Sequence, residues 1–327
     1  MEKFSLIEFH QTRDFGKKIN ATFEFLKQNF KPLGKSILFI AGPAVLIGSI
    51  FIGSFVSDFL GMSFAAQSGD TTETLKYFGS VTFWAQMGLM YVFLIISYVI
   101  TLATINSYVW LYYEKQTNQL NVPEVWEKVR ETVWRYLGSI LMIFLGFILF
   151  TIFATVMFII LQKISTFLLG LAIFAVFLAA IYVLVGMSMM FYIQVQEDKG
   201  FLEAAGRSLQ LVRGKWWSTF GLAIVLSMIG GAISYVFIIP YYIYMGLTMM
   251  NSVTPGQALA ISPVFKMVSF AFLIVYYMAQ MLLHTLPSVG LVFQYFNLVE
   301  MKEAKGLMRD LENFGKAGQE PPSQDTF

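Results

Sequence analysis

Six long apolar stretches constrain the fold of this chain more than any other feature of its sequence. Each is long enough to cross a hydrocarbon layer of about 30 Å, which takes about 20 helical residues. None alternates polar and apolar residues as a membrane-spanning strand does, so a barrel of strands is excluded. The sequence therefore predicts six transmembrane helices, at Ser36–Leu60, Phe83–Tyr113, Leu137–Gln162, Thr166–Val195, Trp217–Leu247 and Val264–Val299.

The composition supports an all-α integral membrane protein. Apolar residues make up 57% of the 327 residues and charged residues only 13%, which is too much apolar surface for one soluble core. The chain contains no cysteine, and this excludes disulfides, thiol catalysis and cysteine metal sites. We expect a single membrane domain over residues 1–313 and a disordered cytoplasmic tail over residues 314–327.

Basic residues are distributed unevenly along the chain. They cluster before the first span, between the second and third, between the fourth and fifth, and after the sixth. The opposite connections carry only Lys76, Lys163 and Lys266. Because loops rich in lysine and arginine stay on the cytoplasmic side, both termini are predicted to be cytoplasmic. The first span starts too far from the terminus to be a cleaved signal peptide.

Spans one, three and five each follow a stretch with apolar residues at helical spacing. This pattern predicts three helical hairpins, each preceded by a cytoplasmic amphipathic interfacial helix, in a pseudo-threefold repeat at about 12–115, 121–198 and 200–302. Such helices also occur in membrane proteins without any internal repeat. The apolar stripes are Phe15, Ile19, Phe23, Leu26 and Phe30; Val125, Trp126, Val129, Val133 and Trp134; and Phe201, Leu202, Ala205, Ser208, Leu209 and Val212.

Similar junctions connect the interfacial helices to their spans. They read KPLGKSIL from Lys31, RYLGSIL from Arg135 and, more loosely, GKWWSTFG from Gly214. A short joint of basic and small residues lets an in-plane helix bend into the bilayer, so we expect a bend at each junction. Spans two, four and six end in aromatic residues and a glutamate, which we interpret as a solvated helix end at the lipid boundary: Glu114, Glu197 and Glu300.

The segment from Glu197 to Trp217, EDKGFLEAAGRSLQLVRGKWW, concentrates charge, glycine and tryptophan in one cytoplasmic connection. We interpret it as a docking elbow that orients a hairpin rather than as a catalytic motif. Its candidate residues are Glu197, Gly200, Glu203, Arg207, Ser208, Gly214 and Trp217.

This segment also resembles the signature of a bacterial membrane-domain family related to the membrane portion of glycerophosphoryl diester phosphodiesterases. In that pattern an acidic residue and a glycine precede Glu–Ala, and a basic–serine pair, a glycine and a tryptophan follow. The resemblance covers the elbow and is only topological elsewhere. It implies a six-span protein of the bacterial cytoplasmic (inner) membrane. The family's hydrolase activity resides in a separate soluble barrel, which we expect this chain to lack.

Small residues recur at four-residue spacing on the first and fifth spans. Such residues let helix backbones approach closely in lipid, so these faces are candidate helix-packing surfaces. The packing neighbour is either this chain or a partner. The residues are Ser49, Gly53, Ser57 and Gly61, and Thr219, Ala223, Ser227 and Gly231.

Ionisable residues inside spans are costly and often mark a transport or proton path. The main candidate is His284, because nearby Pro287 frees a backbone carbonyl. It either lines a small polar pocket or bonds to a neighbouring carbonyl. His10 and His284 are the only histidines and lie far apart, so a histidine metal cluster or a Ser-His-Asp site lacks its parts. We predict no enzymatic activity, no cofactor and no metal.

These features favour a non-catalytic multi-pass subunit that scaffolds or anchors a larger membrane protein assembly. Its expected partners are the lipid bilayer and other integral membrane proteins, with no nucleic acid. The alternative is a transporter or lipid-handling membrane protein with a cavity between the hairpins.

Overall fold

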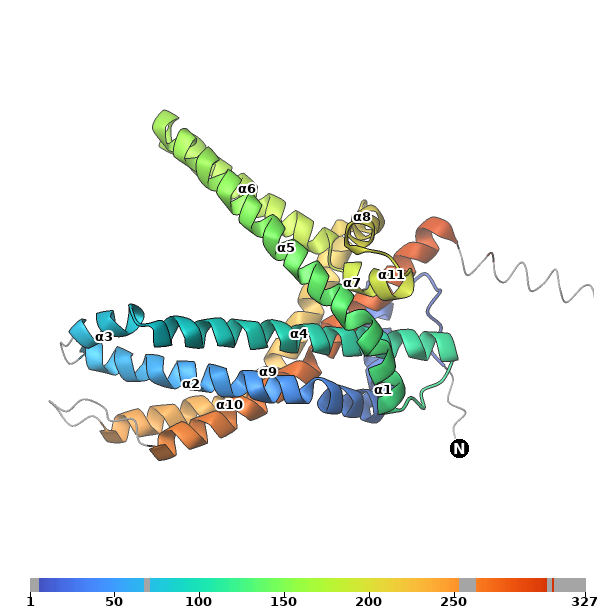
Figure 1. The fold of residues 1–327 in the computed structure, drawn as a ribbon. Coiled ribbons are helices and arrows are strands. Elements are labelled where there is room, and N and C mark those ends of the chain that lie inside the picture. Colours follow the sequence, from blue (N-terminus) through green and yellow to red (C-terminus); the bar gives the residue numbers. More distant parts are fainter. Residues whose placement is uncertain (1–5, 68–70, 253–262, 305–307, 309–327) are drawn as a thin grey trace, which may run out of the picture.

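The computed structural model describes residues 6–67, 71–252, 263–304 and 308 of the chain, so the predicted tail at 314–327 lies outside the described residues. Over the described ranges the protein is helical and contains no strand (Figure 1). The helices are α1 (Phe15–Ile40), α2 (Gly42–Gln67), α3 (Thr71–Phe78), α4 (Val81–Lys115), α5 (Val122–Ile164), α6 (Thr166–Gly186), α7 (Met190–Gln196), α8 (Phe201–Val212), α9 (Trp216–Ser252), α10 (Pro263–Leu283) and α11 (Thr285–Glu303).

Six helical stretches are long and apolar enough to cross a membrane, which confirms the predicted all-α class and its six apolar helices. The first begins at Gly42, later than the predicted Ser36, because α1 extends to Ile40. The stretches are Gly42–Phe59, Val81–Lys115, Val122–Ile164, Thr166–Gln196, Trp216–Thr248 and Val264–Glu303.

The long helices fall into two groups that share one base. Helix α2 contacts both α4 and α10, and α10 contacts α9, so these four helices form one bundle. Helices α5 and α6 contact each other, and α5 also contacts α4, but away from that contact both helices run away from the bundle (Figure 1). Helices α1, α7, α8 and α11 gather at the end where the two groups meet. We call this end the base.

Aromatic residues form the centre of the base. The Phe9 ring stacks on Phe293 with 5.2 Å between centroids, and Phe25 meets Tyr112 edge-on at 5.0 Å. The segment before α1 is fixed there by hydrogen bonds as well, since the Arg13 N–H donates to Asn297 Oδ1 at 2.7 Å. Residues 6–14, which form no helix, therefore link α4 and α11 in one core, because Phe9 contacts both Tyr112 of α4 and Phe293 of α11.

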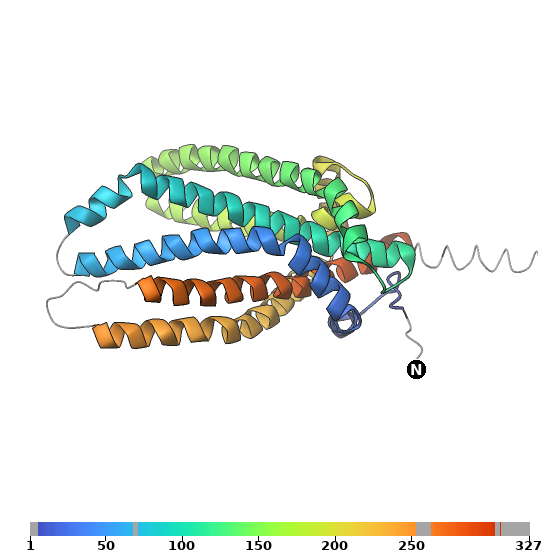
Figure 2. The same ribbon diagram turned by 60° about the horizontal axis from the view of Figure 1, so that its bottom comes forward.

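The predicted bends differ from the observed ones. Helix α1 continues through the Lys31 junction and breaks at Ala41, where α2 starts in a new direction (Figure 2). Helix α5 stays continuous through the Arg135 junction, because a helical glycine such as Gly138 costs only about 1 kcal/mol and does not end a helix, although its first turns run in a different direction from its later part (Figure 1). Only the third junction is a turn, at Gly214, whose φ of +82° suits glycine.

The sixth apolar stretch is interrupted at His284, between α10 and α11. Pro287 has no N–H to give to the Leu283 carbonyl four residues earlier, so the helical hydrogen-bond pattern is broken there. Gly230 of α9 packs against this carbonyl, since a Cβ at Gly230 would lie 3.5 Å from it. The break is thus a site of close approach between α9 and the α10–α11 junction.

Candidate functional site

Glu197 is the centre of the segment from Glu197 to Trp217, which we call the elbow. It follows α7, and its side chain is only 14% exposed. Its carboxylate accepts hydrogen bonds from Lys199 Nζ at 2.6 Å, Arg207 Nε at 3.1 Å and the Tyr295 hydroxyl at 2.8 Å. Because Arg207 lies on α8 and Tyr295 on α11, this one carboxylate joins three helices.

The network around Glu197 is charged at neutral pH. Burial on its own raises the pKa of the Glu197 carboxyl, but the hydrogen bonds from Lys199, Tyr295 and Arg207 outweigh it and hold the pKa below its usual range. Burial lowers the pKa of Arg207, yet its bonds to Glu303 and Glu197 outweigh that effect and raise the pKa. Arg207 therefore stays an ion-pair partner of two carboxylates, one from α11.

Other elbow contacts attach α8 to its neighbours. The buried Ser208 hydroxyl donates to the Gly186 carbonyl at the end of α6, at 2.6 Å. Lys302 Nζ donates to the carbonyls of Gln210 and Arg213, at 2.6 and 3.1 Å, and so caps the last turn of α8 from α11. The elbow thus fixes the end of α6 to α11.

The remaining elbow candidates do not join this network. Gly200 is the extended residue before α8, and Gly214 forms the turn after it. Glu203 is exposed, and Trp217 is 77% exposed at the start of α9. It is Trp216 that makes the contact, through its indole N–H to the Tyr182 carbonyl of α6 at 3.1 Å.

Sequence reasoning missed the partners that α11 contributes, namely Tyr295, Lys302 and Glu303. The only sequence pattern that could have pointed to these residues was the ending of aromatic residues, glutamate and lysine that spans two, four and six share. We interpreted the recurrent glutamates as solvated, and this is wrong for Glu197 and Glu300, whose side chains are 14% and 11% exposed.

The small residues of α2 face neighbours within this chain. Ser49, Gly53 and Ser57 are buried, and a Cβ at Gly53 would lie only 2.8 Å from the Phe270 ring of α10. The backbone of Gly61 lies in α2, but its surroundings lie outside the described residues.

The small residues of α9 are less uniformly placed. Thr219 is buried and accepts a hydrogen bond from Gln294 Nε2 of α11 at 2.9 Å. Ala223 and Gly231 are half-buried, and Ser227 is exposed. The fully buried positions farther along this helix are Leu222 and Leu226.

His284 lies beside a small cavity of about 200 Å³ between α2, α4 and α10. Its ring packs near Tyr98 of α4, with 5.3 Å between centroids, and its Nδ1 is 3.4 Å from the Ser288 hydroxyl. Ser97 also lines the cavity, and its buried hydroxyl has no hydrogen-bond partner among the described residues. Across residues 6–67, 71–252, 263–304 and 308, no three His, Cys, Asp or Glu side chains are close enough together to hold a metal ion.

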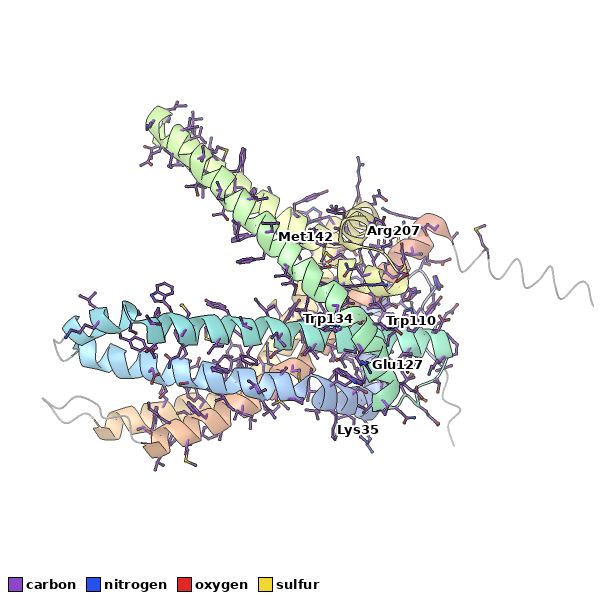
Figure 3. All side chains as sticks on the ribbon, in the orientation of Figure 1. Lys35, Trp110, Glu127, Trp134, Met142 and Arg207 are labelled. Atoms are coloured by element: carbon purple, nitrogen blue, oxygen red, sulfur yellow. The ribbon has the colours of Figure 1, made fainter. Side chains whose placement is uncertain are left out.

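A large unpartnered surface lies on α5 and α6. Every residue from Leu141 to Phe153 is exposed, so α6, which runs beside α5, buries none of them over about three and a half turns. In Figure 3 the side chains near Met142 project outward from the visible edges of α5. A Cβ at Gly146 or Gly170 would meet no atom within 4 Å. We call the two helices beyond Ile140, residues 141–185, the α5–α6 projection.

A protein-family model described as "Domain of unknown function (DUF7847)" matches residues 129–284. The match runs from α5 past the end of α10 and includes the elbow and His284. Its description names no activity, so the resemblance to the phosphodiesterase membrane domain stays a prediction. No curated protein and no solved structure matches the chain.

Proposed function

We propose that this protein is a non-catalytic multi-pass membrane subunit that scaffolds or anchors a larger assembly of membrane proteins. The observation that carries the proposal is the α5–α6 projection, which is exposed from Leu141 to Phe153 and runs away from the bundle of α2, α4, α9 and α10 (Figure 1). Exposed apolar side chains alone do not call for a protein partner, because lipid tails are as apolar as leucine. What favours a partner is a helix pair that leaves a packed base and stands alone.

The base is built to orient this projection. The Ser208 and Trp216 hydrogen bonds hold the end of α6, and Arg135 of α5 pairs with Asp198 in the α7–α8 connection. Gly146 and Gly170 provide positions where a partner helix can approach the backbone closely. The elbow thus sets the direction of the projection, and the projection supplies the contact surface.

The proposal includes a membrane arrangement. Three helical hairpins cross the bacterial inner membrane, preceded by α1, the first turns of α5, and α8 as interfacial helices, with both termini in the cytoplasm. The supporting observations are the clustered basic residues and the elbow's resemblance to a bacterial membrane-domain family.

Gentle solubilisation from the native membrane tests this function. We expect the protein to copurify with a membrane protein in fixed stoichiometry. Gly146→Leu combined with Gly170→Leu should reduce the recovered partner at least tenfold, because leucine occupies the approach positions without contacting this chain. Gly88→Leu is the matched control, since Gly88 is an equally open position on α4. A lone monomer from wild-type membranes would contradict the proposal.

The second candidate, a transporter or lipid-handling protein, is favoured by the cavity at His284. Native mass spectrometry of the mildly solubilised protein should then detect a bound small molecule. Ser97→Leu fills the cavity and should remove the ligand, whereas Gly88→Leu should retain it. A wild-type protein that carries no adduct, or an adduct that persists in Ser97→Leu, counts against this function.

A further inference from the structure

Helix α1 has large apolar side chains that are not buried within the fold. One face packs into the base through Phe25, Leu33 and Ile37, which are at most 2% exposed. Elsewhere on the helix Phe30 is 75% exposed and Phe39, which lies about half a turn around the helix from it, is 67% exposed. Large aromatic side chains left exposed next to a packed face point to contact with something outside this chain.

An apolar groove of about 470 Å³ runs between α1 and the α10–α11 junction. Phe23, Leu26 and Phe30 form one wall, and Leu282 and Leu286 form the other. This volume falls within the range of roughly 300 to 1,000 Å³ that is typical of small-molecule sites. The groove is open to the outside and suits a hydrocarbon chain.

Two lysines border the groove. Lys31 and Lys35 lie one helical turn apart on α1, and both line it. Among the described residues neither forms an ion pair, whereas Lys115 on α4 is paired with Glu124 at 3.1 Å. The Lys35 ammonium lies 6.0 Å from the Phe39 ring centroid, so it stays at the groove's end. The groove therefore combines an apolar wall with two uncompensated positive charges.

A second, more polar hollow of about 630 Å³ adjoins the groove, and Lys35 and Phe39 line both spaces. Its other wall is the start of α5, including Asn121 and Glu124. The Asn121 side chain forms no hydrogen bond with the first backbone N–H groups of α5, so the positive end of the α5 helix dipole faces the polar hollow. The negative charge of Glu124 is offset by its ion pair with Lys115. Figure 3 shows Lys35 at the end of the molecule where α1 meets the first turns of α5.

We propose that α1 and the α10–α11 junction form a binding site for one anionic phospholipid. An acyl chain occupies the apolar groove, the phosphate lies between Lys31 and Lys35, and the rest of the headgroup fills the polar hollow. The site contacts both the acyl chain and the anionic headgroup of its ligand. A phospholipid without net charge and free phosphate therefore each make only part of these contacts. The proposal is independent of the α5–α6 projection, which lies elsewhere on the molecule.

The charge half of the site is tested by adding phosphatidylglycerol or phosphatidylcholine with identical chains to the full-length protein and counting adducts by native mass spectrometry. A lysine near an anionic lipid headgroup contributes about fivefold in affinity. Lys31→Gln with Lys35→Gln should therefore weaken phosphatidylglycerol binding about 25-fold and weaken phosphatidylcholine binding much less, because the choline cation offsets the charge of its phosphate. Lys27→Gln, an exposed lysine on the same helix outside the groove, should change neither.

The apolar half is tested with Gly34→Leu. Gly34 lines the groove, and a Cβ there meets no atom within 4 Å, so leucine fills the groove without straining the fold. Binding of both lipids should fall at least tenfold, whereas Gly170→Leu should leave it unchanged. Equal binding of the two lipids by the wild type would overturn the proposal, as would Gly34→Leu binding at wild-type strength. Competition by inorganic phosphate alone would show a free-anion site instead and would also overturn it.

Discussion

Glu197→Ala is expected to lower the free energy of unfolding by about 2 to 4 kcal/mol, because three donors lose their shared acceptor. The Tyr295 hydroxyl is left without a partner in a buried position, and a buried unsatisfied hydroxyl costs about 1 to 3 kcal/mol. Arg207 keeps Glu303, and Lys199 is exposed enough to turn to water, which limits the loss. Denaturant unfolding of the solubilised protein measures the effect.

Two further variants separate this network from a general effect of losing a carboxylate. Glu203→Ala removes an exposed carboxylate in the first turn of α8 and should cost less than about 1 kcal/mol. Tyr295→Phe removes the hydroxyl that needs the acceptor, so the double variant should be less destabilised than the sum of the single ones. Strict additivity, or equal losses for Glu203→Ala and Glu197→Ala, would show that the network does not hold the elbow.

Acidification should reproduce the loss of the Glu197 network. The pKa of Glu197 in the folded protein lies below its ordinary value of 4.5, so the folded state favours the ionised carboxylate. The stabilisation is fully present above pH 4.5 and is lost as the pH falls through the folded-state pKa. The stability difference between wild type and Glu197→Ala should therefore shrink below pH 4.5. A difference that stays constant down to strongly acidic pH would exclude an ionic contribution.

Phe293→Ala is expected to cost about 3 to 5 kcal/mol, the usual loss for truncating a fully buried phenylalanine. Phe293 has no exposed surface and stacks on Phe9, and the Arg13 guanidinium lies 5.3 Å from its ring centroid. The truncation leaves a void where α11, α1 and the segment before α1 meet. Unfolding of the solubilised protein, followed by tryptophan fluorescence, should show the lower stability.

Phe177→Ala on α6 is the matched control for the aromatic core. Phe177 is 58% exposed on the projection, so its truncation should change the free energy of unfolding by at most about 0.5 kcal/mol. This contrast separates the base, where side chains hold the fold, from the projection, where they do not. Comparable losses in the two variants would mean that the projection is packed within this chain.

The apolar helices were predictable because their signal is local. A run of about 20 apolar residues identifies a spanning helix whatever its neighbours are. The ends of these helices were less predictable. Gly138 stays helical within α5, and the break after α1 occurs at Ala41, outside the basic junction that we expected to bend.

The small-residue stripes show how helical geometry limits sequence reasoning. Four residues turn an α-helix by about 400°, so a strict four-residue stripe drifts by about 40° at each step. On α2 the drift is harmless, because α4 and α10 contact this helix, and Ser49, Gly53 and Ser57 all stay buried. On α9 it carries Ser227 to an exposed face, away from buried Thr219.

The partners of the elbow could not be predicted, because they are distant in sequence. Glu197 and Tyr295 are 98 residues apart, and no local pattern states that α11 ends beside α8. The elbow sequence indicated a cytoplasmic connection rich in charge. Only the packing of the base shows which of its charges are used internally and which face outward.

A photo-crosslinking scan in native membranes tests the central claim most directly. A photoreactive amino acid is placed at each position from Leu141 to Phe153, and the adducts are identified by mass spectrometry. The scaffold proposal predicts adducts to one protein at positions three or four residues apart, which form one face of α5. Adducts to lipid alone, at every position and without helical periodicity, would contradict it.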